Sequence, residues 1–342
     1  MPAAKTERSI SDATGSDGPV SATVDAGPLA TASEEAPVSP VVCWFQGKFQ
    51  PLADARISVM THGFLYGTGI FEGIRAYWNA DQGQLYGLKL VEHFTRLVKN
   101  CKLMLMEPPG TPSELVDLTV ELLRRNGWRE DVYVRPTVYK STEAIGVRLH
   151  NLENDFVLVS VPFGDYVDTN RGITMGTVGW RRVPDQALPA RGKITGAYVN
   201  SAFSKSEAVL NGFDEAVVLT VEGHVSEGSA ANIAMVRDGT VITPPVSDDI
   251  LEGVTRMGLK EICARELELP WVERSIDRSE LFLADEVILF GTGVQVAPVV
   301  EIDHRPIGAG GIGPVGKRLR DLYFDIVRGK VPGYDHWLTP VY

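Results

Sequence analysis

Apolar and polar positions follow helical and strand periods in turn from residue 41 onward. Residues 90–103 predict a helix, because one face would carry Val91, Phe94, Leu97, Val98 and Cys101. Residues 111–114 read Thr-Pro-Ser-Glu, which is a capping box with proline at the first helical position. A second helix is therefore predicted from this box to about Gly127.

Strand patterns surround these two helices and then dominate the chain. Two strands are predicted at 132–135 and 156–162, and residues 41–45 with the turn at 46–48 predict a hairpin. Further strands are predicted at 173–178, 215–221, 224–225, 233–236, 241–242 and 286–290. Glu222-Gly223 and Asp238-Gly239 are predicted to form hairpin turns. The apolar positions 259, 262, 263 and 267 predict a helix, and residues 314–327 predict a last one.

The order of these elements predicts two α/β domains of different size. We expect a small α/β domain at 41–162, a link at 163–172 and a larger domain at 173–342. Residues 1–40 contain no aromatic residue and are rich in Ala, Ser, Thr, Pro and Asp, so we predict a disordered tail. This tail has no apolar core of a secretory signal, and its acidic residues are atypical of a transit peptide.

Composition and charge narrow the classes of function. A net charge of -11 disfavours nucleic-acid binding and anionic membranes, and no apolar run reaches the length of a membrane helix. Three cysteines lie far apart, at Cys43, Cys101 and Cys263, which favours a reducing cytoplasm. The histidines are scattered, so no metal site is expected.

Five distant stretches each offer a group that pyridoxal 5'-phosphate requires. Lys193 follows a glycine and offers an imine-forming amine, while Glu227 offers a carboxylate for the pyridine nitrogen. Residues 253–256 begin a predicted helix whose amides would face a phosphate, and residues 291–293 read Gly-Thr-Gly after a predicted strand. Arg96 offers a full charge and a bidentate fork. Taken singly, these residues fit a surface lysine, a turn glutamate, ordinary glycine turns and an exposed arginine at least as well.

Two further patterns concern substrate and fold. Tyr133 and Arg135 share a face of their strand, so they are placed to receive a substrate carboxylate or to form a structural pair. Residues 67–73 contain three glycines, but the third comes one position late for a dinucleotide fingerprint and no parallel βαβ pattern surrounds them. A Rossmann enzyme is therefore rejected.

The chain from about residue 41 to 342 resembles the class IV aminotransferases, the fold-type IV pyridoxal-phosphate enzymes. Within that class it is most similar to branched-chain amino acid aminotransferases. The resemblance rests on Met-Thr-His-Gly-Phe-Leu-Tyr-Gly-Thr-Gly at 60–69, Phe-Glu-Gly-Ile-Arg-Ala-Tyr at 71–77, Tyr-Val-Arg-Pro at 133–136, Ser-Glu-Gly at 226–228, Thr-Pro-Pro at 243–245, Ile-Leu-Glu-Gly-Val-Thr-Arg at 250–256 and Leu-Ala-Asp-Glu-Val at 283–287.

This resemblance implies a fold, a cofactor and site residues. The implied fold is a small α/β domain plus a larger pseudo-barrel α/β domain, and the implied cofactor is pyridoxal 5'-phosphate. Lys193 stands at the Schiff-base lysine, Tyr198 at the ring hydroxyl and Glu227 at the ring nitrogen. The phosphate positions are Arg96, Val254, Thr255 and Thr292. The substrate positions are Tyr66, Phe71, Gly73, Arg75, Tyr133, Arg135, Tyr166, Thr292 and Gly293.

The resemblance also implies a reaction and an assembly. The expected activity moves the amino group of leucine, isoleucine or valine to 2-oxoglutarate, in a cytoplasmic homodimer or higher homo-oligomer whose pocket is completed by a partner loop. An (R)-amine transaminase, a D-amino-acid aminotransferase, an aminodeoxychorismate-lyase-like enzyme and a non-catalytic cofactor-binding protein are the alternatives. Residues 141–148, Ala234 and the pair Val294-Gln295 depart from the branched-chain pattern and bear on substrate scope.

Overall fold

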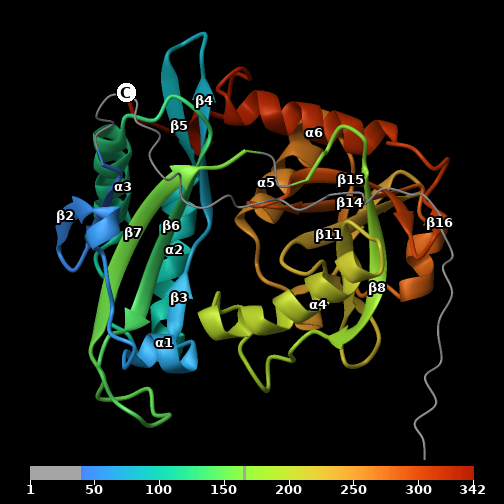
Figure 1. The fold of residues 1–342 in the computed structure, drawn as a ribbon. Coiled ribbons are helices and arrows are strands. Elements are labelled where there is room, and N and C mark those ends of the chain that lie inside the picture. Colours follow the sequence, from blue (N-terminus) through green and yellow to red (C-terminus); the bar gives the residue numbers. More distant parts are fainter. Residues whose placement is uncertain (1–39, 165–166) are drawn as a thin grey trace, which may run out of the picture. The chain divides into compact units, whose positions relative to one another are not determined.

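The computed structural model describes residues 40–164 and 167–342 (Figure 1). Residues 1–39 of the predicted tail lie outside the described residues. Tyr166, which was predicted to bind substrate, also lies outside them. The described residues form one compact unit built on two β-sheets. Within the described ranges, no helix combines the length and the apolar character needed to cross a membrane.

The first sheet is antiparallel in every pairing, and its described strands run in the order β17-β5-β4-β6-β7-β1-β2, with β3 paired to β6. The strands are β1 Val42–Phe45, β2 Lys48–Pro51, β3 Gly69–Phe71, β4 Ile74–Asn79, β5 Gln84–Leu88, β6 Val132–Lys140, β7 Asn154–Pro162 and β17 Leu338–Pro340. The predicted β1–β2 hairpin is confirmed. The two other predicted strands are present and longer than expected. Strand β6 continues to Lys140, because the proline at position 136 lies inside it without ending it, and β7 begins two residues earlier than predicted.

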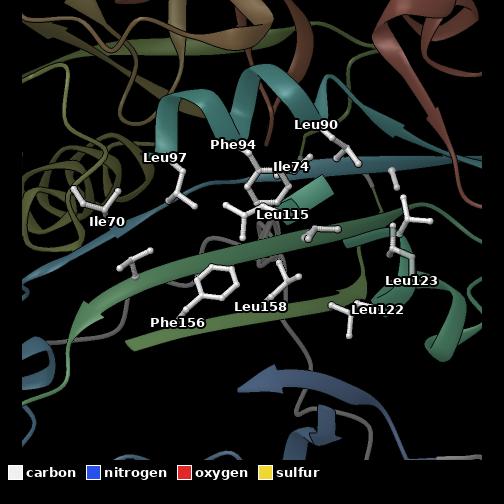
Figure 2. Packing of buried hydrophobic residues seen from close by; sticks show 14 of the residues in the cluster. Ile70, Ile74, Leu90, Phe94, Leu97, Leu115, Leu122, Leu123, Phe156 and Leu158 are labelled. Atoms are coloured by element: carbon white, nitrogen blue, oxygen red, sulfur yellow. The ribbon is translucent and has the colours of Figure 1, made fainter. Parts of the chain in front are cut away.

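Two helices pack on this sheet and on each other, α2 Leu90–Cys101 and α3 Pro112–Asn126. Figure 2 shows Phe94 and Leu97 of α2 projecting toward the strand that carries Phe156 and Leu158. The predicted capping box is confirmed, since Glu114 N–H donates to Thr111 Oγ1 at 3.3 Å and Thr111 N–H donates to Glu114 Oε2 at 2.8 Å. Gly127 ends α3 with φ 65°, a conformation that glycine adopts without strain.

The predicted apolar face of α2 is wrong at one position. Val91 is 54% exposed, because the buried stripe follows Leu90, Phe94, Leu97 and Cys101 at intervals of four and three residues. His93 and Asn100 occupy the buried face that the apolar pattern assigned to carbon side chains alone. The helix also ends at Cys101, and residues 102–104 form a separate 3₁₀ turn.

The second sheet is mixed, and its described strands run in the order β10-β9-β8-β15-β14-β11-β12-β13, with β16 paired to β15. Its strands are β8 Ile173–Arg181, β9 Glu215–Leu219, β10 Val225–Glu227, β11 Asn232–Arg237, β12 Thr240–Thr243, β13 Trp271–Glu273, β14 Glu286–Gly291, β15 Gln295–Ile302 and β16 Arg305–Pro306. Strand β8 is parallel to both of its neighbours, β9 and β15, and β12 is parallel to β13. All the strands predicted beyond residue 172 are therefore present.

Three helices pack on the second sheet: α4 Tyr198–Leu210 on β8 and β9, and α5 Val254–Ile262 and α6 Pro314–Val327 on β14 and its neighbours. The predicted bounds of α6 are confirmed. A π-helical turn at Cys263–Leu267 extends α5, which explains why the predicted helical pattern continued to residue 267. Figure 1 shows the chain returning after α6, so that β17 joins the first sheet beside β5.

Candidate active site

A cavity of about 560 Å³ gathers residues that are distant in the sequence. Of the predicted site residues, its walls contain Phe71, Gly73, Arg96, Tyr133, Arg135, Lys193, Tyr198, Glu227, Val254, Thr255, Thr292 and Gly293. Arg75 and Tyr66 are not among the lining residues, and Tyr166 lies outside the described chain. The expected convergence of the five stretches is thus found in space.

Lys193 lies in the turn that leads into α4. Its Nζ donates to Tyr198 Oη at 2.7 Å and lies 5.0 Å from the centre of the Phe71 ring. Its backbone is also fixed, because Phe71 N–H donates to Lys193 O at 3.1 Å. The amine is therefore held against a phenol and an aromatic wall at the edge of the cavity.

Glu227 ends strand β10 and is only 3% exposed. Arg182 pairs with its Oε1 at 2.9 Å, while Asn232 Nδ2 and Leu251 N–H donate to its Oε2 at 3.1 and 3.2 Å. Burial raises the pKa of Glu227, and the Arg182 charge opposes that shift. Arg182 was not predicted from the sequence, because no local pattern relates an arginine directly after a strand to a carboxylate 45 residues later.

The beginning of α5 faces the same cavity. Gly253 is the N-cap residue and offers no side-chain acceptor, so the first-turn amides of Val254 and Thr255 are available to an anion. A Cβ at Gly253 would lie 2.1 Å from Asn232 Oδ1, so this close approach requires glycine. The turn at Thr292 and Gly293 also lines the cavity, between β14 and β15.

Arg96 reaches the cavity from α2, and its partners were not predicted. Its Nε and Nη2 donate to Glu72 Oε1 and Oε2 at 2.7 and 2.6 Å, and its Nη1 donates to the backbone oxygen of Glu252 at 2.6 Å. His93 Nδ1 lies 2.8 Å from Glu72 Oε2. Burial raises the pKa of Glu72, but the charge and hydrogen bonds of Arg96 outweigh it and hold that pKa at about 2.

Tyr133 and Arg135 share one face of β6, as their spacing predicted. Arg135 Nη2 donates to Tyr133 Oη at 2.8 Å, and the guanidinium lies 4.3 Å from the centre of the Phe71 ring. A Cβ at Gly73 would lie 2.4 Å from Tyr133 Oη, so the phenol fills the space beside that glycine. A hydroxyl and a guanidinium thus stand together in the cavity wall.

Arg75 lies behind the cavity wall and is 1% exposed. Its guanidinium donates to the backbone oxygens of Thr292 and Gly293 at 2.9 and 3.0 Å, and to those of Phe163 and Gly164 at 3.1 and 3.0 Å. Tyr66 lies at a second cavity of about 800 Å³, where its Oη accepts a hydrogen bond from Gly146 N–H at 3.1 Å.

The residues around the first cavity fit pyridoxal 5'-phosphate. The cavity brings together a lysine amine, a phenol, a buried carboxylate and a helix N-terminus beside an arginine. Gly73 and Gly253 would carry Cβ atoms at 2.4 and 2.1 Å from wall atoms, so the walls close tightly around glycine positions. These are the groups that the aldehyde, the ring hydroxyl, the ring nitrogen and the phosphate require.

Comparison with known proteins identifies the family. The family model described as amino-transferase class IV matches residues 69–302. The chain is 47% identical over 299 residues to the probable branched-chain-amino-acid aminotransferase of Aquifex aeolicus, covering 87% of this chain and 96% of the relative. It is 32% identical to the branched-chain-amino-acid aminotransferase of Escherichia coli K12, with 87% and 96% covered.

Solved structures show the same fold. The branched-chain aminotransferase of Thermoproteus uzoniensis, crystallised with norvaline, matches with a TM-score of 0.84 at 39% identity, covering 88% of this chain and 99% of that chain. The branched-chain amino acid aminotransferase of Thermobaculum terrenum, in its pyridoxal-phosphate form, matches with a TM-score of 0.85 at 33% identity, covering 90% and 100%. The chain therefore belongs to the class IV aminotransferases, in the group of branched-chain amino acid aminotransferases, which are pyridoxal-phosphate enzymes.

Proposed function

We propose that this enzyme moves the amino group of leucine, isoleucine or valine to 2-oxoglutarate, giving a branched-chain 2-oxo acid and L-glutamate. The observation that carries the proposal is one cavity that holds the Lys193 amine, the buried Glu227 carboxylate and the N-terminus of α5. The names of the relatives support the substrate class.

The same arrangement gives each residue a role toward the cofactor. Arg96, the amides of Val254 and Thr255, and Thr292 would hold the phosphate, Tyr198 would bind the ring hydroxyl, and Glu227 would bind the ring nitrogen. Arg182 balances the charge of Glu227, so that the carboxylate stays available as an acceptor in a buried place. When bound, pyridoxal phosphate supplies an electron sink for negative charge that develops at the substrate α-carbon.

Lys193 is the catalytic base in this proposal. Its amine removes the proton from the substrate α-carbon, and its hydrogen bond with Tyr198 at 2.7 Å orients it toward the cavity. The aromatic contact with Phe71 limits the positions that the side chain adopts.

The substrate side of the cavity accommodates two kinds of side chain. Phe71 and Tyr133 offer apolar ring surface, and Arg135 beside them offers a fork for a carboxylate. Relatives of this fold were crystallised with norvaline, with 4-methylvaleric acid and with N-(5'-phosphopyridoxyl)-L-glutamate. We therefore expect an apolar amino acid and glutamate to use the same pocket in turn, with Gly73, Arg75 and the turn at 292–293 supporting its walls.

The enzyme works as a homodimer in this proposal. Val59, Phe64 and Val199 are 71%, 64% and 61% exposed, and Phe64 and Val199 line the second cavity of about 800 Å³. Exposed apolar side chains gathered at a hollow are typical of an interface between protein chains. We place the enzyme in the cytoplasm because the cysteines at 43, 101 and 263 are free thiols.

The absorbance spectrum of purified protein tests the proposal. A visible band that converts to the pyridoxamine form on addition of L-leucine, L-isoleucine or L-valine without acceptor is the expected result. Lys193→Ala should abolish turnover, while Lys317→Ala, an exposed lysine on α6, should leave it unchanged. A band that ignores all three L-amino acids but responds to an (R)-amine or D-amino acid would replace the substrate assignment, and an active Lys193→Ala variant would refute the role of the lysine.

A further inference from the structure

Glu72 lies in a fully buried position between two residues of the cavity wall, Phe71 and Gly73. It is 0% exposed, yet the mechanism proposed above gives it no task. A buried carboxylate without compensation costs several kcal/mol, so its partners must offset that cost. Those partners are Arg96 and His93, at 2.6 and 2.8 Å.

The contact with Arg96 fixes the plane of the guanidinium. Both oxygens of Glu72 accept from adjacent nitrogens, Nε and Nη2, at 2.7 and 2.6 Å, which is the bidentate geometry that gives an arginine one defined orientation. A guanidinium has five N–H donors. Two are held by Glu72 and one by the Glu252 oxygen, which leaves two donors for the cavity that Arg96 lines.

The third bond connects α2 with the N-terminus of α5. Glu252 directly precedes Gly253, the N-cap of α5, and its oxygen accepts from Arg96 Nη1 at 2.6 Å. The charged half and the amide half of the anion site are therefore joined through this one arginine. An arginine free to rotate would point its two remaining donors elsewhere and lose this connection.

His93 holds Glu72 from the other side. Its ring is 2% exposed and lies one helical turn before Arg96 on α2, with Nδ1 at 2.8 Å from Glu72 Oε2. Burial lowers the pKa of His93, which keeps the ring neutral near pH 7, and a neutral ring donating through Nδ1 adds no charge to the site. Glu72 thus accepts three hydrogen bonds from two residues of α2.

The negative charge of Glu72 and the orientation that it gives to Arg96 have opposite effects on phosphate binding. The Glu72 carboxylate cancels the formal charge of Arg96, and a negative group near a phosphate weakens anion binding through space. The benefit of the Glu72 carboxylate must therefore come from the orientation that it gives to the Arg96 guanidinium. Its removal would add attraction for the phosphate while releasing the fork from its fixed orientation.

We propose that Glu72 is a positioning residue of the cofactor phosphate site, which aims Arg96 at the phosphate and locks α2 to the beginning of α5. This inference rests on the proposed cofactor site. It implies that Glu72 increases phosphate affinity more, by orienting Arg96, than its negative charge decreases that affinity. Because Phe71 and Gly73 flank it, the same short segment supports both the phosphate site and the substrate wall.

The test compares binding of pyridoxal phosphate with binding of pyridoxal, which lacks the phosphate, to apo-protein by absorbance titration. Glu72→Gln should weaken pyridoxal phosphate binding by roughly ten- to a hundredfold, as expected for a lost charge-assisted bond. Pyridoxal binding should change less than about twofold. Glu121→Gln is the matched control, since Glu121 pairs with Arg125 at 2.8 Å on the exposed face of α3.

A second variant keeps the test decisive if Glu72→Gln does not fold. Glu72→Asp retains the charge but is one methylene shorter, so it reaches only one arginine nitrogen and should also lose phosphate-specific affinity. Unchanged or tighter pyridoxal phosphate binding in a folded variant would overturn the proposal, and so would an equal loss for both ligands. Wild-type protein that binds neither ligand would instead refute the cofactor site itself.

Discussion

Arg75→Met removes a cation that the structure surrounds with peptide oxygens. Four backbone carbonyls accept from Arg75: those of Thr292 and Gly293 in the turn between β14 and β15, and those of Phe163 and Gly164 after β7. The guanidinium is 1% exposed and its centre also lies 4.6 Å from the centre of the Phe163 ring. Methionine preserves most of the apolar stem and none of the donors.

The magnitude follows from those contacts. A hydrogen bond to a charged group contributes about 1.5–3 kcal/mol, and a buried acceptor left without a donor costs about 1–3 kcal/mol. Because the four acceptors relax together and water reaches some of them, the effects do not add. We expect Arg75→Met to lower the free energy of unfolding by about 3–5 kcal/mol, which is the range for breaking a buried polar network.

Urea denaturation of the apo-protein, followed by circular dichroism, measures this loss. Arg75→Lys should be intermediate, since an ammonium keeps the charge but cannot reach oxygens spread around a planar fork. Arg318→Met, at an exposed position of α6, is the control and should change stability by less than about 0.5 kcal/mol. A loss below about 1 kcal/mol for Arg75→Met would refute the argument that this arginine holds the turn.

Two other perturbations test the cavity wall and the charge network. In Gly73→Ala the new Cβ would lie 2.4 Å from Tyr133 Oη and displace the phenol from Arg135. Steady-state kinetics should therefore show KM for the amino acid raised by about tenfold, with kcat less affected. Gly311→Ala is the control and should leave the kinetics unchanged, because its Cβ would meet no atom within 4 Å. Burial raises the pKa of Asp303, but the Thr177 amide and Arg278 outweigh it and lower that pKa, so its stabilisation is present above about pH 4 and is lost as pH falls toward the folded value. Asp303→Asn should therefore lower the free energy of unfolding by about 1–3 kcal/mol at pH 7 and by much less near pH 3 in denaturation titrations, and a loss that does not depend on pH would contradict this assignment.

The elements that the sequence predicted best are those with local signals. The capping box fixed the beginning of α3 through two hydrogen bonds within four residues, and α6 begins with a proline at its first position, Pro314. Helix α4 was not predicted, because it begins from a 3₁₀ turn with no side-chain cap. Val91 was placed wrongly since a short apolar pattern does not reveal on which of two adjoining faces the sheet will pack.

The same distinction holds for the site. Groups that the cofactor chemistry demands, such as Lys193 and Glu227, are recognisable as residue types in a suitable local setting. Their partners are not, because Arg182 and Glu72 act across 45 and 24 residues of sequence through contacts that only the folded chain creates. A buried charge pair is selected by its surroundings, so neither period nor spacing marks it in advance.

The stretch from Phe71 to Arg75, which runs from the end of β3 into β4, shows why these partners matter. Phe71 forms a wall of the cavity and its N–H donates to Lys193 O at 3.1 Å, so the wall also holds the backbone of the lysine. The next residue, Glu72, turns its side chain to α2 and its N–H to Pro136 O on β6 at 3.0 Å. Arg75 then holds the turn that carries Thr292 and Gly293. Because successive residues of an extended chain point in opposite directions, one strand connection supports the lysine, the arginine on α2 and the turn after β14 at once. A change in its backbone would therefore disturb all three together, whereas a side-chain substitution disturbs only one.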